Sequence, residues 1–284
     1  MTIFAALAIL AFIACFALTK ERVVQAKTQE GSFKKDLHSL LHNEQWLIVA
    51  LLGLVSLIAI VVRGGTGYTF ANWILKNDQL TMDFSFYKIV FNDSEQYLTY
   101  LTSSFLTAAT VAAMIGAGFA STVTAKLDKA PSYALAQVII VACSVGLYFV
   151  PPQNLLLVFG LWITINFFTQ MAAPILFAMA ADTADYGELK TGRRVTGLIF
   201  SGFLFAIKLG VALGGFAIGY ILATYGYDGK ASTQSDTALY GVLLAISLLP
   251  ALGHFLLIPI VFFYQLSTQR CNEIRQELDA LSAQ

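Results

Sequence analysis

Residues 195–223 read VTGLIFSGFLFAIKLGVALGGFAIGYILA and contain one charged residue, Lys208. A transmembrane helix needs about 20 mostly apolar residues to cross the hydrocarbon core of a bilayer. This run exceeds that length, so it predicts a helix that spans a membrane. Glycines spaced four residues apart allow two membrane helices to approach closely. The run holds two such pairs, Gly210 with Gly214 and Gly215 with Gly219.

The composition of the whole chain indicates the same environment. Of its 284 residues, 57% are hydrophobic and 12% are charged, whereas a soluble domain has about 25% charged residues. Lipid must therefore be the solvent for most of the chain, and the predicted fold is an all-α integral membrane protein. Seven stretches are apolar and long enough to span: 2–18, 46–74, 98–121, 133–150, 155–180, 195–223 and 239–264.

Basic residues are distributed unevenly over the loops between these spans. Lys and Arg accumulate on the cytoplasmic side of a membrane. Twelve of them lie in the loops on one side and in the C-terminal tail, whereas three lie on the other side: Lys76, Lys88 and Lys230. The N-terminus is therefore expected outside and the C-terminus in the cytoplasm, in agreement with an odd number of spans.

Two polar stretches predict short helices on the cytoplasmic face. Residues 33–45 place apolar side chains at helical spacing, and residues 269–282 form an apolar stripe with charges opposite. The first span has a signal peptide as its alternative, although no basic residue precedes its apolar run. The expected organisation is a transmembrane helix over 1–18, a cytoplasmic linker over 19–45, a six-helix bundle over 46–264 and a tail helix over 265–284.

Several functional classes are disfavoured. The net charge is zero, with 17 basic and 17 acidic residues, which gives no reason to expect a nucleic-acid partner. The three cysteines are far apart and form no cluster with histidine, so neither a disulfide framework nor a metal site is indicated. The spans contain no HExxH, no GxSxG and no paired acids. We therefore do not expect an intramembrane enzyme.

Lys208 lies too deep in its span to reach water. At a rise of 1.5 Å per residue, Arg194 is about 21 Å away along the helix, and the outer end near Tyr225 is about 25 Å away. A lysine side chain extends only several ångströms, so its ammonium group reaches neither surface. We expect Lys208 to face a hydrated cavity or to pair with an acceptor on another helix. A structural lysine bonded to backbone carbonyls is the alternative.

Arg63 and His254 are the other ionisable residues in the predicted spans, which hold no Asp or Glu. Arg63 precedes Gly64, Gly65 and Gly67, and an interrupted helix beside a charge is typical of a transporter binding site. The alternative is an arginine that reaches the outer interface. His254 is expected to bond to a neighbouring helix, with a role in proton transfer as the alternative.

Polar side chains also occur in the fifth span, in the stretch NFFTQMAAP, where a proline is expected to kink the helix. They fit the wall of a cavity, or equally polar contacts between helices. The candidates to face a substrate are Lys208, Arg63, Asn166, Thr169 and Gln170.

Residues 180–197 read AADTADYGELKTGRRVTG and are expected to form a cytoplasmic turn between two spans. A surface loop would explain polar residues, but not three acids and three bases facing each other across a tight connection. Such pairs can latch helix ends in one conformation and release them in another. The charged residues are Asp182, Asp185, Glu188, Lys190, Arg193 and Arg194.

The string ADTADYGELKTGRR, followed by GLIFSGFLFAIKLGVALGG, resembles the signature of the glycoside-pentoside-hexuronide:cation symporters. These are members of the major facilitator superfamily. The similarity continues backward through the RGGTGYTF region to TKERV at 19–23, and forward to QRCNEIRQEL in the tail. It implies a C-terminal six-helix bundle of the major facilitator fold, preceded by one transmembrane helix of the N-terminal half and the central cytoplasmic linker.

The resemblance also implies a function. Such proteins carry a sugar or glycoside together with Na⁺ or H⁺ by alternating access, as multi-pass proteins of the bacterial inner membrane. It aligns Lys208 with a lysine tied to coupling, and Asp182, Asp185 and Arg193 or Arg194 with a charged network that closes the inner side. No cofactor is implied beyond the coupling cation.

The family's cation site is formed mainly by aspartates of the N-terminal half, whose helices this sequence lacks. The resemblance therefore implies that half as a partner, besides sugar and membrane lipid. The alternative is a non-transporting membrane half-protein, either truncated or regulatory. At the level of substrate, the alternative is a lipid-transporting relative of the superfamily.

Overall fold

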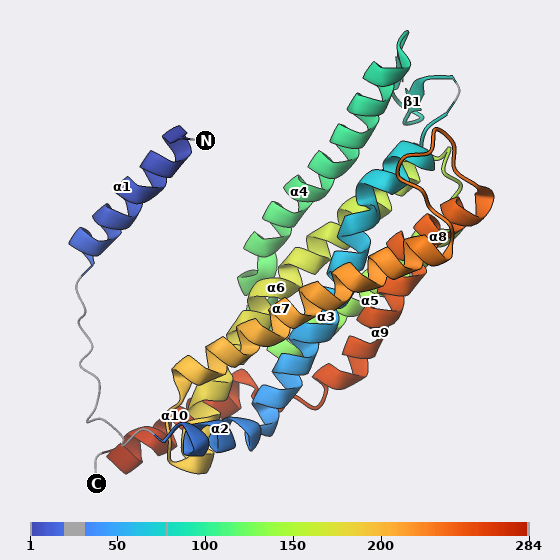
Figure 1. Cartoon of the computed structure of the whole chain (residues 1–284). Coiled ribbons are helices and arrows are strands. Elements are labelled where there is room, and N and C mark those ends of the chain that lie inside the picture. The colour runs from blue at the N-terminus through green and yellow to red at the C-terminus, as the bar shows by residue number, and fades with distance from the viewer. Residues whose placement is uncertain (1, 20–31, 78, 283–284) are drawn as a thin grey trace. The chain divides into compact units, whose positions relative to one another are not determined.

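The structure of the chain is a computed structural model that describes residues 2–19, 32–77 and 79–282 (Figure 1). The chain divides into two compact units, Met1–Lys35 and Asp36–Gln284, whose boundary falls inside the predicted linker. Residues 20–31 of that linker lie outside the described residues. With them lie three of its predicted cytoplasmic bases, Lys20, Arg22 and Lys27.

The first unit contains α1 (Thr2–Leu18), which is helical over its predicted span and holds no charged residue. Its 17 residues fall short of the about 20 that cross a bilayer. Among the described residues, six other helices are long and apolar enough to cross a membrane. They match the six predicted spans from 46 to 264, and α1 is a shorter apolar helix.

The second unit is a bundle of helices with one small hairpin (Figure 1). The predicted soluble helices are present, and α2 crosses the boundary between the units. The hairpin pairs Thr81 with Val90 in an antiparallel register. The elements are α2 (Phe33–Leu41), α3 (Glu44–Trp73), β1 (Thr81–Asp83), β2 (Lys88–Val90), α4 (Ser94–Leu127), α5 (Lys129–Phe149), α6 (Leu155–Thr191), α7 (Thr196–Thr224), α8 (Asp236–Ile246), α9 (Leu248–Val261) and α10 (Thr268–Ser282).

Side chains at the helix ends satisfy backbone groups that have no partner within the helix. The side chains of Asn43, Asp93, Asn154 and Ser235 each accept a hydrogen bond from a backbone N–H three residues further on. At its other end α6 stops at Gly192, which has φ 69°. Glycine adopts this left-handed conformation without steric cost, so it ends the helix sharply.

The last span consists of two helices, α8 and α9, which meet at Ser247. Proline has no backbone N–H, so Pro250 cannot donate to the carbonyl four residues earlier, that of Ile246. The normal helical pattern is kept on either side, because Ser247 donates to Leu243 and Ala251 donates to Ser247. One carbonyl in the middle of the span is therefore left without its helical donor.

The predicted interruption of the helix after Arg63 is wrong. Helix α3 is continuous from Glu44 to Trp73 and includes all three glycines of this stretch. In hydrocarbon, broken backbone hydrogen bonds have no water to replace them, which favours a regular helix. Two of the glycines are instead sites of helix contact. A Cβ on Gly65 would lie 2.6 Å from Ile218, and one on Gly67 would lie 3.5 Å from Trp162.

The predicted cytoplasmic turn over 180–197 is also mostly wrong. Helix α6 continues to Thr191, passing through Pro174 without a break, so only 192–195 connect it to α7. The stretch ADTADYGELKT was predicted as a loop because it is polar, but its charged residues lie along the end of a helix that projects beyond the apolar span. The charged residues therefore lie on the end of α6 and on the short connection after it, rather than within one long turn.

The helices approach most closely where a glycine replaces a side chain. A Cβ on Gly116 of α4 would lie 2.1 Å from the carbonyl oxygen of Phe167 in α6. On α7, Cβ atoms on Gly210 and Gly214 would lie 2.5 and 3.0 Å from carbonyl oxygens of α3. This confirms one predicted glycine pair. Gly215 and Gly219 of the second pair have nothing within 4 Å, so that pair is not used inside the unit.

We expect Gly116→Ala to destabilise the bundle. The new methyl group cannot fit without separating α4 from α6, and overpacking of this kind costs about 1–3 kcal/mol. Gly118→Ala is the matched control, because a Cβ there meets nothing within 4 Å. Thermal unfolding of the purified chain in detergent should show a lower midpoint for the first variant alone. Equal midpoints would contradict the close contact of α4 and α6.

Candidate functional site

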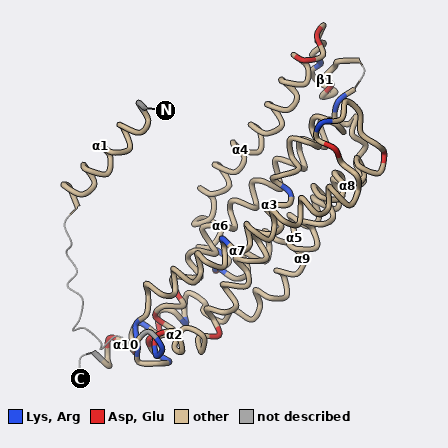
Figure 2. Tube along the Cα trace, viewed as in Figure 1, with Lys and Arg blue, Asp and Glu red and all other residues tan. Residues whose placement is uncertain are grey.

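Charged residues gather at the two ends of the second unit (Figure 2). At the end where α6 meets α7, Asp182 forms an ion pair with Lys129 at the start of α5. The Tyr264 hydroxyl, which follows α9, donates to the same carboxylate over 2.8 Å. The Asp182 side chain is 9% exposed, so water screens this pair less than a surface pair. Asp182 thereby joins three parts of the chain at their ends.

Arg194 is the base that pairs with the acids at the end of α6. Its guanidinium donates to Glu188 over 2.7 Å and to Asp185 over 3.2 Å. Asp185 also accepts from Arg275 of the tail helix α10 over 3.3 Å. Arg194 thus pairs back onto two acids of α6, and Arg275 of the tail helix pairs with one of them.

The other two bases of the predicted network pair with different elements. Arg193 pairs with Asp36 of α2 over 2.6 Å. Lys190 forms an ion pair with Glu44 at the start of α3, and Glu44 also accepts from the Tyr186 hydroxyl. The pairs therefore tie α3, α5 and α10 to the end of α6, and α2 to the connection that follows it. These partners were missed from the sequence because they come from segments up to 157 residues away.

The tail helix covers the Asp182 pair. Thr268, its first residue, donates through its backbone N–H and its hydroxyl to Asp128, at 2.9 and 2.8 Å. Cys271 is buried, with its sulfur 3.9 Å from the Lys129 ammonium. Burial, together with the negative charge of Asp182, raises the pKa of Cys271 to about 11. The same two causes raise the pKa of Tyr264. Both groups therefore stay protonated at neutral pH.

Arg63 lies within the bundle rather than at its surface, with 3% of the residue exposed. Its guanidinium donates to the Ser144 hydroxyl over 2.7 Å and to the Ile246 carbonyl over 3.3 Å. That carbonyl is the one that Pro250 leaves without a donor. The arginine thus joins α3 to α5 and to the break between α8 and α9. It neither reaches the outer interface nor lies beside Lys208.

His254 completes this buried network. Its Nε2 lies 3.2 Å from the Arg63 guanidinium, and its Nδ1 lies 2.7 Å from the side-chain oxygen of Gln137. Arginine only donates, so Nε2 must accept and the ring proton must sit on Nδ1, from which it donates to Gln137. His254 is therefore neutral and bonded to neighbouring helices, as expected. Protonation of Nε2 would place an N–H against the N–H donor of Arg63. This geometry argues against the alternative that His254 transfers protons.

Two members of the network were missed from the sequence, Ser144 and Gln137. Both lie in the predicted span 133–150, and neither is ionisable. Amide and hydroxyl side chains in an otherwise apolar span were the available signal, since polar groups within hydrocarbon need partners.

Lys208 lies on an exposed face of α7. Among the described residues, no hydrogen bond or ion pair involves its ammonium group. Of the other candidates, Arg63 is buried, and Asn166 and Thr169 are half-buried. Asn166 and Thr169 donate to carbonyls of their own helix, those of Trp162 and Ile165, and Gln170 is exposed. Among the described residues, no hydrogen bond joins any two of the five substrate candidates.

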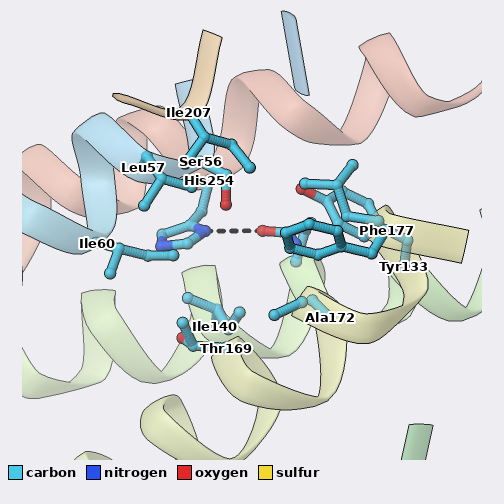
Figure 3. Close-up of a pocket in the computed structure, with 13 residues that line it drawn as sticks. Ser56, Leu57, Ile60, Tyr133, Ile140, Thr169, Ala172, Phe177, Ile207 and His254 are labelled. Carbon is cyan, nitrogen blue, oxygen red and sulfur yellow. Dashed lines mark hydrogen bonds between the residues drawn. The ribbon is translucent and has the colours of Figure 1, made fainter. Parts of the chain in front are cut away.

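A cavity of about 40 Å³ lies between α3, α5, α6, α7 and α9 (Figure 3). Its polar lining consists of Ser56, Tyr133, Gln137, Thr169 and His254. From α7 it is lined by Ile207, the neighbour of Lys208. Of the substrate candidates, only Thr169 lines it. Within the described residues, no group of three or more His, Cys, Asp or Glu side chains is arranged to hold a metal ion.

The unit has six helices long and apolar enough to span a membrane, an exposed lysine on one of them and a network of ion pairs at one end. These are features of a multi-pass membrane protein of the transporter class. Residues 1–92 and 97–268 match the family of MFS/sugar transport proteins, and the chain belongs to this family. This confirms the resemblance to glycoside-pentoside-hexuronide:cation symporters and to their C-terminal half.

Individual relatives agree with this assignment. The chain is 31% identical over 278 residues to the inner membrane symporter YicJ of Escherichia coli (strain K12), covering 96% of this chain and 56% of that protein. It is 28% identical over 264 residues to the putative glycoside/cation symporter YagG of the same organism, covering 93% of this chain and 53% of that one. The chain thus spans about half the length of the curated relatives it matches.

The fold is also that of solved transporters. The proton:xylose symporter XylE bound to 6-bromo-6-deoxy-D-glucose superposes with a TM-score of 0.59 at 16% identity, covering 82% of this chain and 48% of that one. An inward-open structure of the xylose transporter XylE from E. coli gives a TM-score of 0.53 at 18% identity, covering 82% and 56%. The predicted all-α bundle of the major facilitator fold is confirmed.

We expect Ser144→Ala to destabilise the chain by about 1.5–3 kcal/mol, because a buried guanidinium N–H loses its acceptor. Ser201→Ala is the matched control. Its hydroxyl also bonds to a carbonyl of its own helix, but it lies on an exposed face without an arginine partner. Denaturation of both purified variants should show a loss only for the first. Similar stabilities would mean that Ser144 contributes little to holding Arg63.

We expect Cys271 to react slowly with iodoacetamide in a variant that carries Cys15→Ser and Cys143→Ser. The thiolate is the reacting form, and a pKa of about 11 leaves it scarce at neutral pH. Alkylation at pH 7 should be about a hundredfold slower than that of an ordinary thiol, whose pKa is about 8.5, and should accelerate as the pH rises. Rapid alkylation at pH 7 would show that the tail helix does not cover this thiol.

Proposed function

We propose that the chain is the C-terminal part of a sugar:cation symporter that works by alternating access with a complementary N-terminal half. The observation that carries this proposal is the position of Lys208. Its ammonium lies about midway along a helix of 29 residues, on an exposed face and without a partner among the described residues. A charge at the bilayer centre is too costly to face lipid.

The face of α7 that carries Lys208 must therefore be covered by protein or water. The unused glycines on the same helix, Gly215 and Gly219, favour protein, because they leave room for a second helix to approach closely. Relatives about twice as long as this chain contain enough further sequence to form that cover. The exposed side of α7 is accordingly proposed as the wall that faces the other half across the substrate pathway.

Sugar is the proposed substrate class because the family is one of sugar transport proteins, and because a relative is named a glycoside/cation symporter. Na⁺ or H⁺ is proposed as the coupling ion. The predicted spans contain no Asp or Glu, so the carboxylates that bind the cation would come from the other half. The excess of basic residues in one set of loops supports a cytoplasmic C-terminus in a bacterial inner membrane.

Asp182, Asp185, Glu188, Arg193 and Arg194 are proposed to form a gate at the cytoplasmic end. The structure supports a specific version of this role. Each of these residues pairs within its own unit, so the network holds the inner ends of the helices as one body. Alternating access can then proceed by rocking one half against the other.

We expect Lys208→Ala to reduce coupled uptake strongly in a protein that joins this chain to the N-terminal half of YicJ. Coupling free energies of about 1–3 kcal/mol correspond to losses of about 5- to 150-fold. Lys230→Ala, outside the spans, is the control and should leave uptake unchanged. Uptake of labelled glycosides, pentosides and hexuronides into vesicles provides the measurement.

The chain alone provides the complementary test. Reconstituted by itself, it should show no sugar-dependent cation flux, and flux from the chain alone would refute the proposal that it needs a second half. If the joined protein is inserted in the membrane but transports none of the sugars, the chain is a non-transporting half-protein. Uptake that survives Lys208→Ala would leave Lys208 with a structural role only.

A further inference from the structure

An open polar groove lies between the β1–β2 hairpin and the connection from α5 to α6. Figure 1 shows the hairpin at the end of the second unit that is opposite to α10. The volume of the groove is about 710 Å³, within the range of about 300–1,000 Å³ that is typical of small-molecule sites. Eight of its nine lining residues carry an amide, hydroxyl, carboxylate or ammonium group, and the ninth is Pro151. The proposed transport does not use this groove.

One wall of the groove is the polar face of the hairpin. Successive side chains of a strand point to opposite faces. Thr81 and Asp83 of β1 line the groove, whereas Met82 between them is 4% exposed and packs in a hydrophobic cluster of the bundle. Phe84 packs edge-on against Phe159 of α6, with ring centroids 5.2 Å apart. The apolar face therefore fixes the hairpin to the bundle and leaves the polar face to the groove.

Hydrogen bonds hold both walls in place. The Asn77 side chain donates to the backbone carbonyl of Thr81 over 2.8 Å and accepts from its N–H over 3.1 Å. The backbone N–H of Asn77 donates to the Tyr97 hydroxyl of α4 over 3.2 Å. In the opposite wall, the ring of Pro151 fixes its own φ, and its carbonyl accepts from the N–H of Asn154 over 3.0 Å. Because the walls are already formed, a ligand would not have to order them.

Several polar groups of the groove have no partner in the described part of the chain. The side chains of Gln79, Lys88 and Gln153 take part in no hydrogen bond or ion pair there. Asp83 and Lys88 lie opposite each other in the register of the hairpin, yet no ion pair joins these two described residues. The groove thus presents donors and acceptors together, and its one acid and one base cancel in net charge.

We propose that this groove is a binding site for a neutral sugar or glycoside. A sugar carries hydroxyl groups around its ring, and each hydroxyl both donates and accepts hydrogen bonds. The amides of Gln79 and Gln153 can do the same, while Lys88 donates and Asp83 accepts. An apolar ligand would leave these groups without partners, an anion would meet the carboxylate, and a cation would meet the ammonium. All residues of the site belong to this chain, so binding needs neither a second half nor transport.

The first test measures binding to the purified full chain, in a detergent without a sugar headgroup. Saturation-transfer NMR follows titrations with xylose, methyl β-glucoside, lactose and the anion glucuronate. We expect a neutral sugar to bind more tightly than glucuronate. Lys88→Ala should weaken its affinity about tenfold or more, and Gln153→Ala about 2- to 10-fold, because each removes a hydrogen bond. Lys126→Ala and Gln269→Ala, exposed at the other end of the unit, are the matched controls and should leave the affinity unchanged.

The outcomes separate this site from the proposed transport. If none of the neutral sugars binds, or if glucuronate binds more tightly, the proposal is wrong. Equal binding to Lys88→Ala, Gln153→Ala and the unmodified chain means that the sugar lies elsewhere, which also overturns it. Binding that is lost in Lys208→Ala but kept in Lys88→Ala places the sugar on the exposed face of α7. That result supports the proposed function and overturns the site in the groove.

The second test locates the bound sugar by protection of a thiol. Ser85 lines the groove and is exposed, so Ser85→Cys places a thiol of similar size in its wall. In a chain that also carries Cys15→Ser and Cys143→Ser, saturating sugar should slow the alkylation of this thiol by iodoacetamide severalfold, as followed by mass spectrometry. Gln269→Cys in the same background is the control and should react at an unchanged rate. An unchanged rate for Ser85→Cys in the presence of bound sugar overturns the proposal.

Discussion

Every polar group inside this bundle must find its partner within the protein, because hydrocarbon offers none. That constraint explains why α3 stays regular through three glycines, and why serine and threonine hydroxyls inside the spans bond back to carbonyls of their own helices. It also explains the distribution of charge. Acids and bases gather at the two ends of the second unit, and those at the end of α6 form ion pairs.

Arg63 and Lys208 are both charged residues within apolar spans, but they differ in whether their charged groups have hydrogen-bond partners. The guanidinium of Arg63 is surrounded by acceptors from three helices, so the unit accommodates its charge by itself. The ammonium of Lys208 has no such acceptors in the described chain. One basic residue is therefore paired inside the unit, and the other lies on the face that we propose a second half covers. The distinction depends on hydrogen-bond partners and not on hydropathy, since both residues lie in strongly apolar spans.

The six long spans could be predicted because each is a continuous apolar run of sufficient length. The end of α6 could not, because ADTADYGELKT has the polarity of a loop although its residues also suit a helix that projects into water. The network around Arg63 was beyond prediction for another reason. Ser144 and His254 lie about 80 and 190 residues further along the chain, and only the folded bundle brings them to the arginine.

The break between α8 and α9 shows how a proline in one helix and an arginine in another depend on each other. Pro250 removes the donor of the Ile246 carbonyl, and Arg63 of α3 replaces that donor from the side. The last span is therefore interrupted at Ser247, and the carbonyl left without a helical donor there accepts from a side chain of a different helix. A bend at Ser247 would have to stretch or release that contact, so a side chain of α3 restrains the interruption in the last span.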